Sequence, residues 1–313
     1  MSMSRWKIVL IMPYFGRFPE WSDLFFETVR RNSSIDFLFY TDCEIEKYKH
    51  IPNVKYKKMS FSEYISFVNS RIDVKFNPSS PYKLCDLRPL YAHVHYEDIK
   101  DYDFYGWTDM DLLFGDIRKF YNDEILENYD VLSTHKVRIS GHLAIFRNTY
   151  QNRNMYKKIY DWKNQLTYPD FVGIDEHGIT NAYTMTIFDK LNEKFDLNIN
   201  NIITKWCKKR KYKRLYMVEQ YTTPFTTIPW LDGTLNSNQP DEWYYIDGKI
   251  TNNRDKGRDF MYIHFMNYKS SQWRHDGTKA PWEGKEKVCF ASVEDMKNGI
   301  VINNKGIYPL EEK

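Results

Sequence analysis

The N-terminal segment alternates between apolar runs that fit β-strands and one run with helical spacing, and this alternation constrains the fold more than any other feature. Lys7–Gly16 (KIVLIMPYFG) predicts a buried strand that ends in a Pro/Gly loop. Trp21–Asn32 places its apolar residues at helical spacing, and Ile35–Asp42 predicts a second strand. A strand, a helix and a strand in so short a stretch form a βαβ unit with parallel strands and a right-handed crossover. The sequence therefore predicts an α/β fold.

Further apolar runs extend this pattern into a mixed, mainly parallel, Rossmann-like sheet flanked by helices. Val54–Ser60 and Tyr102–Asp109 predict two more strands. Tyr129–His135 predicts a strand that pairs with Gly141–Asn148. With 313 residues, the chain is long enough for one large domain or two ordinary ones.

Polar and aromatic side chains follow several of these strands at their carboxyl ends. Tyr14 and Phe15 follow the first predicted strand, Asp42 ends the second, and Asp109 and Asp111 end the strand near the middle of the chain. In open α/β sheets, ligands bind outside the carboxyl ends of the strands. We therefore expect these five residues to lie on one rim of the sheet.

The Asp109-Met110-Asp111 segment is the strongest candidate for a metal site. Alternate residues at a strand end face the same side, so both carboxylates can address one cation, and Mg²⁺ or Mn²⁺ prefers such oxygen ligands. The alternative is a surface turn or a helix cap. The apolar Leu112–Phe114 stretch makes two unpaired charges costly here and excludes an EF-hand loop. We expect Asp116, beyond that stretch, to cap the next helix.

A histidine near the C-terminus is a candidate third metal ligand. His264 ends the predicted strand Asp259–Phe265. A lone histidine in an apolar strand is more often a core residue. However, polar and aromatic residues that could hold a diphosphate follow it: Asn267, Lys269, Trp273 and Arg274.

Two further segments combine charged residues with predicted helix starts. In Gly173–Gly178 (GIDEHG), two adjacent carboxylates, Asp175 and Glu176, stand at a predicted helix start. Either the acidic pair supplies a general base, or Asp175 is a simple N-cap.

Lys83, Asp86 and Arg88 accompany a predicted helix at Leu84–Tyr96, in which Pro89 is tolerated only near the start. These three residues suit a nucleotide phosphate or ribose contact, or form an ordinary ion-paired cap.

Charge and cysteine usage limit the partners and the compartment. Lys and Arg number 45 and Asp and Glu 42, and no nucleic-acid-binding motif is present, so nucleic acid is not an expected partner. Lys205–Arg214 holds seven basic residues, which form a solvated face or bind an anionic membrane surface. The apolar run Ile8–Met12 is too short for a signal sequence or membrane span. Four widely spaced cysteines fit a reducing cytosol, so we expect a cytoplasmic protein, with peripheral binding to the inner face of the membrane left open.

The chain also resembles a known family. Its segments IMPYFGRFPEW, YKLCDLRPLYAHVHYEDIKDYDFYGWTDMDLLFGDI, SGHLAIFRN, VGIDEHG and YIHF are similar to those of GT-A glycosyltransferases encoded in bacterial capsule and O-antigen gene clusters. The resemblance covers about residues 6–270, and the D-x-D segment is its most specific part. It implies a GT-A-like catalytic domain over residues 1–270, with a donor half at about 1–120, and a C-terminal extension over 271–313.

The resemblance also implies roles for the candidate residues. Mn²⁺ or Mg²⁺ would be bound by Asp109, Asp111 and His264. The nucleotide-sugar donor would be held by Tyr14, Phe15, Asp42, Lys83, Asp86, Arg88 and Lys269. The transferred sugar or the acceptor would be faced by Gly141, His142 and His177.

The implied activity is a metal-dependent hexosyl transfer from a nucleotide-diphosphate-sugar to a glycan or lipid-linked glycan during surface polysaccharide synthesis. The favoured donor is a UDP-sugar, with galactose, as pyranose or furanose, as the sugar. Asp175 or Glu176 as general base favours an inverting reaction. Two alternatives stay open: a metal-dependent nucleotide-sugar hydrolase or phosphoesterase at the same site, and a non-catalytic glycan-binding protein, which the Tyr and Trp content would suit.

Overall fold

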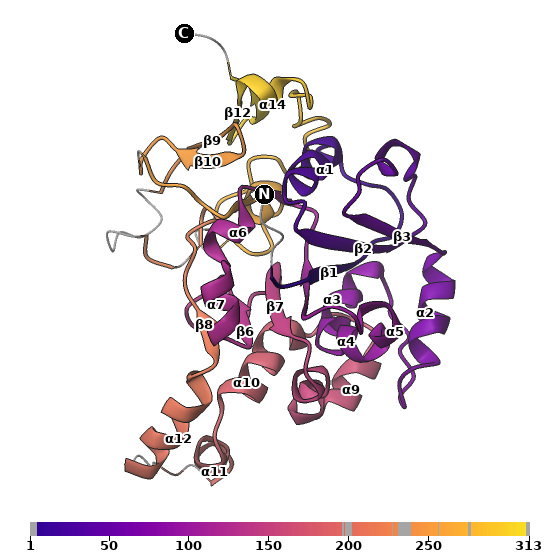
Figure 1. Ribbon diagram of the computed structural model, residues 1–313, viewed down its shortest axis with the longest axis vertical. Helices are drawn as coiled ribbons and strands as arrows, with labels where there is room; N and C mark the ends of the chain where they lie inside the picture. Colours follow the sequence, from indigo (N-terminus) through magenta and orange to yellow (C-terminus); the bar gives the residue numbers. More distant parts are fainter. Residues whose placement is uncertain are drawn as a thin grey trace.

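A seven-stranded mixed sheet forms the centre of the protein (Figure 1). The computed structural model describes residues 5–195, 197, 202–226, 228–230, 239–255, 257–274 and 277–310. In spatial order, the strands are β3 (Val54–Lys58), β2 (Ile35–Thr41), β1 (Ile8–Pro13), β4 (Phe104–Thr108), β7 (Leu143–Arg147), β6 (Val131–Ser133) and β8 (Leu215–Met217). All neighbours pair in parallel except β7, which is antiparallel to both β4 and β6. The predicted mixed, mainly parallel α/β sheet is confirmed.

The N-terminal βαβ unit forms as predicted because β1 is buried on both faces. Its alternate residues enter two different cores: Leu10 and Met12 one, Val9 and Ile11 the other. Helix α1 (Ser22–Arg31) lies on the first face and contributes Leu24, Phe25, Phe26 and Val29 to the core there. A continuous apolar run is the expected pattern for a strand covered on both sides.

The second face is covered by short helical pieces instead of the long helix that the sequence predicts at Leu84–Tyr96. This segment forms η2 (Pro81–Lys83), α3 (Leu84–Leu87), η3 (Arg88–Leu90), α4 (Tyr91–Val94) and α5 (Tyr96–Ile99). The prediction of one helix is wrong because Pro89 lies in the middle of the run, where it lacks the N–H that a continuous helix needs. Arg88 lies at the start of η3, and its side chain contacts Asp109, which follows the carboxyl end of β4.

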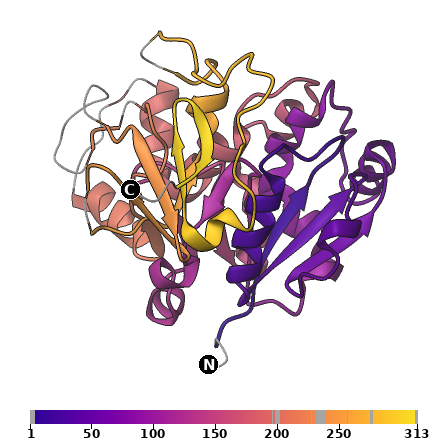
Figure 2. The ribbon, with the colours of Figure 1, turned by 90° about the horizontal axis from the view of Figure 1, so that it is seen from above.

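The C-terminal part adds a separate antiparallel sheet of β10 (Lys249–Asn252), β9 (Glu242–Ile246), β12 (Ile300–Asn303) and β13 (Gly306–Pro309). Its side chains Trp243, Tyr245 and Ile300 join the core on the α1 face. Figure 2 shows this sheet in front of the central one. The boundary expected after residue 270 falls within this region, since β9 on one side of it pairs with β12 on the other. Residues 1–4 and 311–313, at the ends of the expected domains, lie outside the described residues.

The remaining helices lie around the sheets. They are α2 (Phe61–Asn69), α6 (Ile117–Phe120), α7 (Asp123–Asn128), α8 (Tyr150–Arg153), η4 (Met155–Lys158), α9 (Trp162–Thr167), η5 (Ile174–Gly178), α10 (Ile179–Thr184), α11 (Ile187–Phe195), α12 (Ile202–Tyr212), α13 (Met266–Lys269) and α14 (Asp295–Asn298), with a short η1 (Glu46–Tyr48). Asp116 caps α6 by accepting a hydrogen bond from the Lys119 backbone at 3.2 Å, as predicted. Among the described helices, none combines the length and the apolar character needed to cross a membrane.

Candidate functional site

The two aspartates of the D-x-D segment lie in the turn between β4 and a short strand, β5 (Leu112–Phe114). Strand β5 pairs antiparallel with β11 (Tyr262–His264), in a register that places His264 opposite Leu112. The backbone N–H of Phe265 then donates to the Asp111 carbonyl at 2.8 Å. The turn itself is fixed by Trp21, whose indole Nε1 donates to the Met110 carbonyl at 2.7 Å. This pairing brings a histidine from late in the chain beside Asp111.

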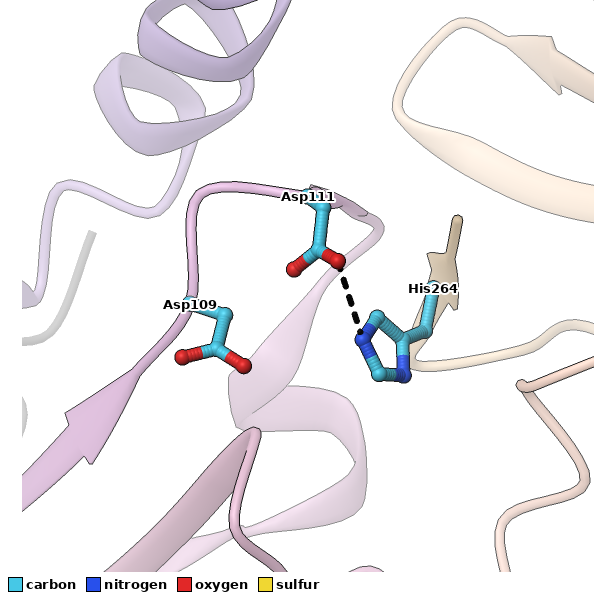
Figure 3. A group of neighbouring side chains, drawn as sticks. All are labelled: Asp109, Asp111 and His264. Atoms are coloured by element: carbon cyan, nitrogen blue, oxygen red, sulfur yellow. Dashed lines mark ion pairs between the residues drawn. The ribbon is translucent and has the colours of Figure 1, made fainter. Parts of the chain in front are cut away.

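Asp109, Asp111 and His264 form a cluster that could hold a metal ion (Figure 3). Each residue offers one ligand atom, and these atoms lie within 4.8 Å of one another. His264 Nε2 lies 3.3 Å from Asp111 Oδ2, and its Nδ1 lies 3.2 Å from the Thr223 hydroxyl. The contact with Thr223 orients the ring so that Nε2 faces the carboxylates. A second interaction that fixes the other ring nitrogen is typical of metal-binding histidines.

Positive side chains surround the two carboxylates. Lys269 Nζ lies 2.8 Å from Asp111 Oδ2. Burial works to raise the pKa of Asp111, but Lys269 and His264 hold that pKa well below its usual range. Arg88 contacts Asp109 through one guanidinium nitrogen and Asp175 through the other, at 2.7 Å from Asp175 Oδ2. The site therefore keeps Asp111 ionised, as a metal ligand must be.

A cavity of about 400 Å³ opens beside this cluster. Of the predicted site residues, the cavity is lined by Tyr14, Phe15, Arg88, Asp109, Asp111 and Lys269. The rest of its wall includes aromatic residues and a thiol to which the sequence assigned no role: Trp21, Tyr82, Cys85 and Tyr91. Tyr82 and Cys85 lie in the segment around the predicted helix start, but only the folded chain shows that they face the rim. A cavity of this size with an apolar wall and a few polar groups is typical of a small-molecule site.

Three predicted donor-site residues lie elsewhere. Lys83 and Asp86 form a fully buried ion pair at 2.9 Å, and Lys83 also donates to the Gln165 carbonyl at 2.8 Å. Asp86 accepts hydrogen bonds from the backbone N–H groups of residues 172 and 174, each at 2.8 Å. This pair ties η2 and α3 to the loop before η5. Asp42 is exposed and accepts a hydrogen bond from Gly16 N at 2.7 Å.

The GIDEHG segment forms the π-helical turn η5, in which Asp175 and Glu176 have different environments. Asp175 is buried against Arg88, and burial raises its pKa to about 7 while Arg88 opposes that rise. Glu176 is partly exposed; its Oε1 accepts from Gly141 N at 3.0 Å, and its Oε2 lies 3.2 Å from Arg138. A Cβ atom at Gly141 would lie 3.1 Å from both an Asp175 and a Glu176 oxygen. The side chains of Asp175 and Glu176 therefore pack closely against Gly141, where a larger residue would be crowded by their oxygens.

Two predicted acceptor residues differ in their placement. His142 is buried and stacks on His264, with ring centroids 4.2 Å apart. Its Nε2 lies 2.6 Å from the Tyr262 hydroxyl and its Nδ1 lies 3.1 Å from Ser140 Oγ. Burial, with His264 and His135 nearby, lowers the pKa of His142 well below its usual range. His142 therefore packs against the candidate metal ligand His264 on the buried side of the site. His177, by contrast, is exposed.

The fold and this site define an α/β protein with a candidate metal centre on the rim of its sheet. The chain belongs to a family described as a family of unknown function, DUF6625, whose profile matches residues 10–311. No curated protein matches this chain.

Similar solved structures include the galactosyltransferase LgtC in complex with donor and acceptor sugar analogues, at 11% identity over 56% of this chain and 69% of that chain, with a TM-score of 0.34. Another is a glycosyltransferase involved in glycosylation of the major capsid of PBCV-1, at 11% identity over 69% and 84%, with a TM-score of 0.33. Mouse xyloside xylosyltransferase 1 matches at 9% identity over 72% and 89%, with a TM-score of 0.35. These likenesses are weak, so a functional proposal must rest on the residues of this chain.

Proposed function

We propose that the protein is a metal-dependent glycosyltransferase that uses a nucleotide-diphosphate-sugar. The observation that carries this proposal is the cluster of Asp109, Asp111 and His264, whose two aspartates line an aromatic-walled cavity. The residues fit Mn²⁺ or Mg²⁺, because two carboxylates supply hard oxygen ligands, Asp111 is held ionised and three ligand atoms converge. Such ions share their coordination with the phosphates of a substrate.

The cavity wall supplies groups for each part of the donor. Tyr14 and Phe15 offer aromatic surface for the nucleoside base. Asp42, outside the cavity wall and directly after β2, would contact the ribose. Lys269 and Arg88 place positive charge beside the aspartates, where a diphosphate would lie. We propose a UDP-sugar as the donor, with galactose as the first sugar to test, and a glycan or lipid-linked glycan of a surface polysaccharide as the acceptor.

The same charges suit the chemistry of glycosyl transfer. Breaking the bond to the sugar leaves a nucleoside diphosphate with growing negative charge, which a bound divalent cation stabilises. Lys269 would stabilise the same negative charge, because its ammonium lies 2.8 Å from Asp111 Oδ2 and therefore beside the place proposed for the diphosphate. Arg88, fixed by Asp175, would hold Asp109 in place.

An inverting reaction would need a carboxylate to accept the proton of the acceptor hydroxyl. Of the two candidates, Glu176 is the one whose side chain reaches solvent, at 28% exposure, whereas that of Asp175 is 3% exposed and lies behind Arg88. We therefore assign the base to Glu176 and the positioning of Arg88 to Asp175.

The proposal is tested by incubating the protein with a panel of nucleotide-sugars and glycan acceptors, with Mn²⁺ or with excess chelator. We expect Mn²⁺-dependent release of nucleoside diphosphate that needs the acceptor and is lost in Asp111→Asn. Asp116→Asn is the matched control, since Asp116 only caps α6. Full activity in chelator would contradict metal dependence, and donor cleavage indifferent to acceptor would identify a hydrolase. Glycan binding that survives loss of both aspartates, without turnover, would identify a binding protein.

A further inference from the structure

Helices α11 and α12 carry an exposed face that is both apolar and basic. Figure 1 shows them at the opposite end of the long axis from the C-terminal antiparallel sheet. The two helices contact each other through an ion pair of 2.7 Å between Lys208 and Asp189. Between residues 187 and 214 the chain has nine Lys or Arg and three Asp or Glu, whereas the whole protein has a net charge of only +3. Positive charge is therefore concentrated in this segment.

The large apolar side chains of α12 point outwards. Ile202 is 84% exposed, Ile203 56% and Trp206 59%, whereas Thr204 is buried. Ile202, Trp206 and Lys209 follow the i, i+4, i+7 spacing that aligns residues on one face of a helix. This orientation is the reverse of the usual surface helix, whose apolar stripe faces the core. On α11, Ile187 and Phe195 are also exposed.

Basic side chains interleave with these apolar ones on the same outward face. Among the described residues, no ion pair engages Lys205, Lys209 or Lys213, and all three are exposed. The Arg210 guanidinium lies over the Trp206 ring, 5.6 Å from its centroid. Trp with Ile on the apolar side and Lys or Arg around it is the composition of helices that lie in the interface of a bilayer.

We propose that the outward face of α12, formed by Ile202, Ile203, Lys205, Trp206, Lys209 and Arg210, docks the protein on an anionic lipid bilayer, together with Lys213 just after the helix. The three apolar residues enter the boundary between headgroups and acyl chains, and the lysines contact lipid phosphates. A second copy of the chain is a poor occupant, since two faces of the same positive sign repel each other. Nucleic acid would match the charge but leaves the exposed isoleucines without a partner.

This proposal goes beyond the proposed transfer reaction and gives it a location, because a lipid-linked acceptor would lie in the surface that α12 contacts. The test needs neither donor nor metal, so its failure and the failure of the transferase proposal are distinguishable. The protein is floated with vesicles of phosphatidylcholine alone and of phosphatidylcholine with phosphatidylserine, at low and high salt. We expect binding only to the anionic vesicles, and weaker binding at high salt.

Two variants separate the contributions of charge and apolar contact. Lys205→Gln/Lys209→Gln/Lys213→Gln should weaken binding on the order of a hundredfold, since each charge near the surface contributes about 1 kcal/mol. Ile203→Ser/Trp206→Ser should also weaken binding while the positive charge is unchanged. The control Lys75→Gln/Lys249→Gln/Lys279→Gln removes three exposed lysines elsewhere and should bind like the wild type. Circular dichroism verifies that all variants keep their helices.

Three results would overturn the proposal. The first is a wild-type protein that does not float with anionic vesicles. The second is an equal loss of binding in the control variant, which would show that only total charge matters. The third is binding of duplex DNA at lower protein concentration than anionic vesicles, which would identify nucleic acid as the partner.

Discussion

The imidazole of His142 stacks on that of His264, with ring centroids 4.2 Å apart and planes inclined by 30°. His142 is held in turn by Tyr262 and Ser140, one at each ring nitrogen. Since Asp109, Asp111 and His264 are the proposed metal ligands, His142 acts as a support that fixes the direction of one ligand. Residues that orient metal ligands typically affect metal affinity by about 10–100-fold.

Replacing His142 should therefore weaken metal binding without removing a ligand. We expect His142→Ala to lower Mn²⁺ affinity by about 10–100-fold, and His142→Phe, which keeps a flat ring against His264, to recover part of that loss. Titration of the protein with Mn²⁺, followed by electron paramagnetic resonance, measures both variants. Equal Mn²⁺ affinity in His142→Ala and wild type would show that the stack has no role in the site.

Glu176→Gln should separate chemistry from binding. The amide keeps the shape of the side chain and an oxygen for Gly141 N but cannot accept the proton of an acceptor hydroxyl. We expect kcat to fall by about 10²–10⁴-fold, with donor KM and Mn²⁺ affinity close to wild type. A variant that keeps its kcat would exclude Glu176 as the base and leave either Asp175 as the base or a retaining reaction.

The buried pair of Lys83 and Asp86 should affect stability more than catalysis. Removing one member leaves the other charge buried without a partner, which costs about 3–5 kcal/mol. Asp86→Ala also removes the acceptor of two backbone N–H groups, of Val172 before η5 and of Ile174 at its start. We expect a lower free energy of unfolding in urea for Asp86→Ala and for Lys83→Met. Near wild-type stability, together with a raised donor KM, would instead support the donor-binding role that the family resemblance implied.

Buried His95 should make the fold sensitive to acid. Its Nε2 lies 3.0 Å from the Tyr64 hydroxyl, and burial lowers the pKa of His95 from 6.5 to about 3 while Asp98 opposes that shift. Between these two values, the unfolded chain binds a proton at His95 that the folded protein does not. Stability from this group is therefore complete above pH 6.5 and is lost as the pH falls towards 3, at up to about 1.4 kcal/mol per pH unit.

The comparison that isolates this effect is wild type against His95→Gln. Urea unfolding across the range from pH 7 to pH 4 should give a shallower loss of stability for the variant, which has no imidazole to protonate. Carboxylates that do not interact with His95 contribute to the acid response of both proteins and cancel in the difference, whereas the contribution of Asp98 changes with the variant because His95 lowers its pKa. Equal slopes for the two proteins would show that His95 is not the group responsible.

Much of the sheet and part of the site follow from local sequence pattern. Strand β1 is a continuous apolar run, and α1 and β2 complete a βαβ unit at the expected positions. Because ligands bind beyond the carboxyl ends of parallel strands, the sequence could place Tyr14, Phe15 and the two aspartates near one another. The structure brings these residues to one cavity.

The rest depends on contacts that no local pattern specifies. The pairing of β5 with β11 joins segments separated by a long stretch of chain, so the nearness of His264 to Asp111 could only be guessed from residue type. Lys83 and Asp86 lie in a charged segment that looks like a phosphate site, and only their burial shows that they satisfy each other. Trp21 and Tyr82 stand in segments that resemble the family, but aromatic residues are common throughout this chain, so the sequence did not single them out as part of the cavity wall.

The central claim is that Asp109, Asp111 and His264 bind a divalent cation that in turn binds a nucleoside diphosphate. Thermal unfolding of the protein with UDP, with Mn²⁺, and with both measures it most directly. At saturating concentrations, UDP and Mn²⁺ together should raise the wild-type Tm by several degrees, because the ligands bind only the folded protein. UDP in excess chelator should leave the Tm unchanged. With UDP and Mn²⁺, Asp111→Asn should show no rise in Tm, whereas Asp116→Asn should show the same rise as the wild type. An equal rise with UDP in excess chelator, or an undiminished rise in Asp111→Asn, would contradict the account.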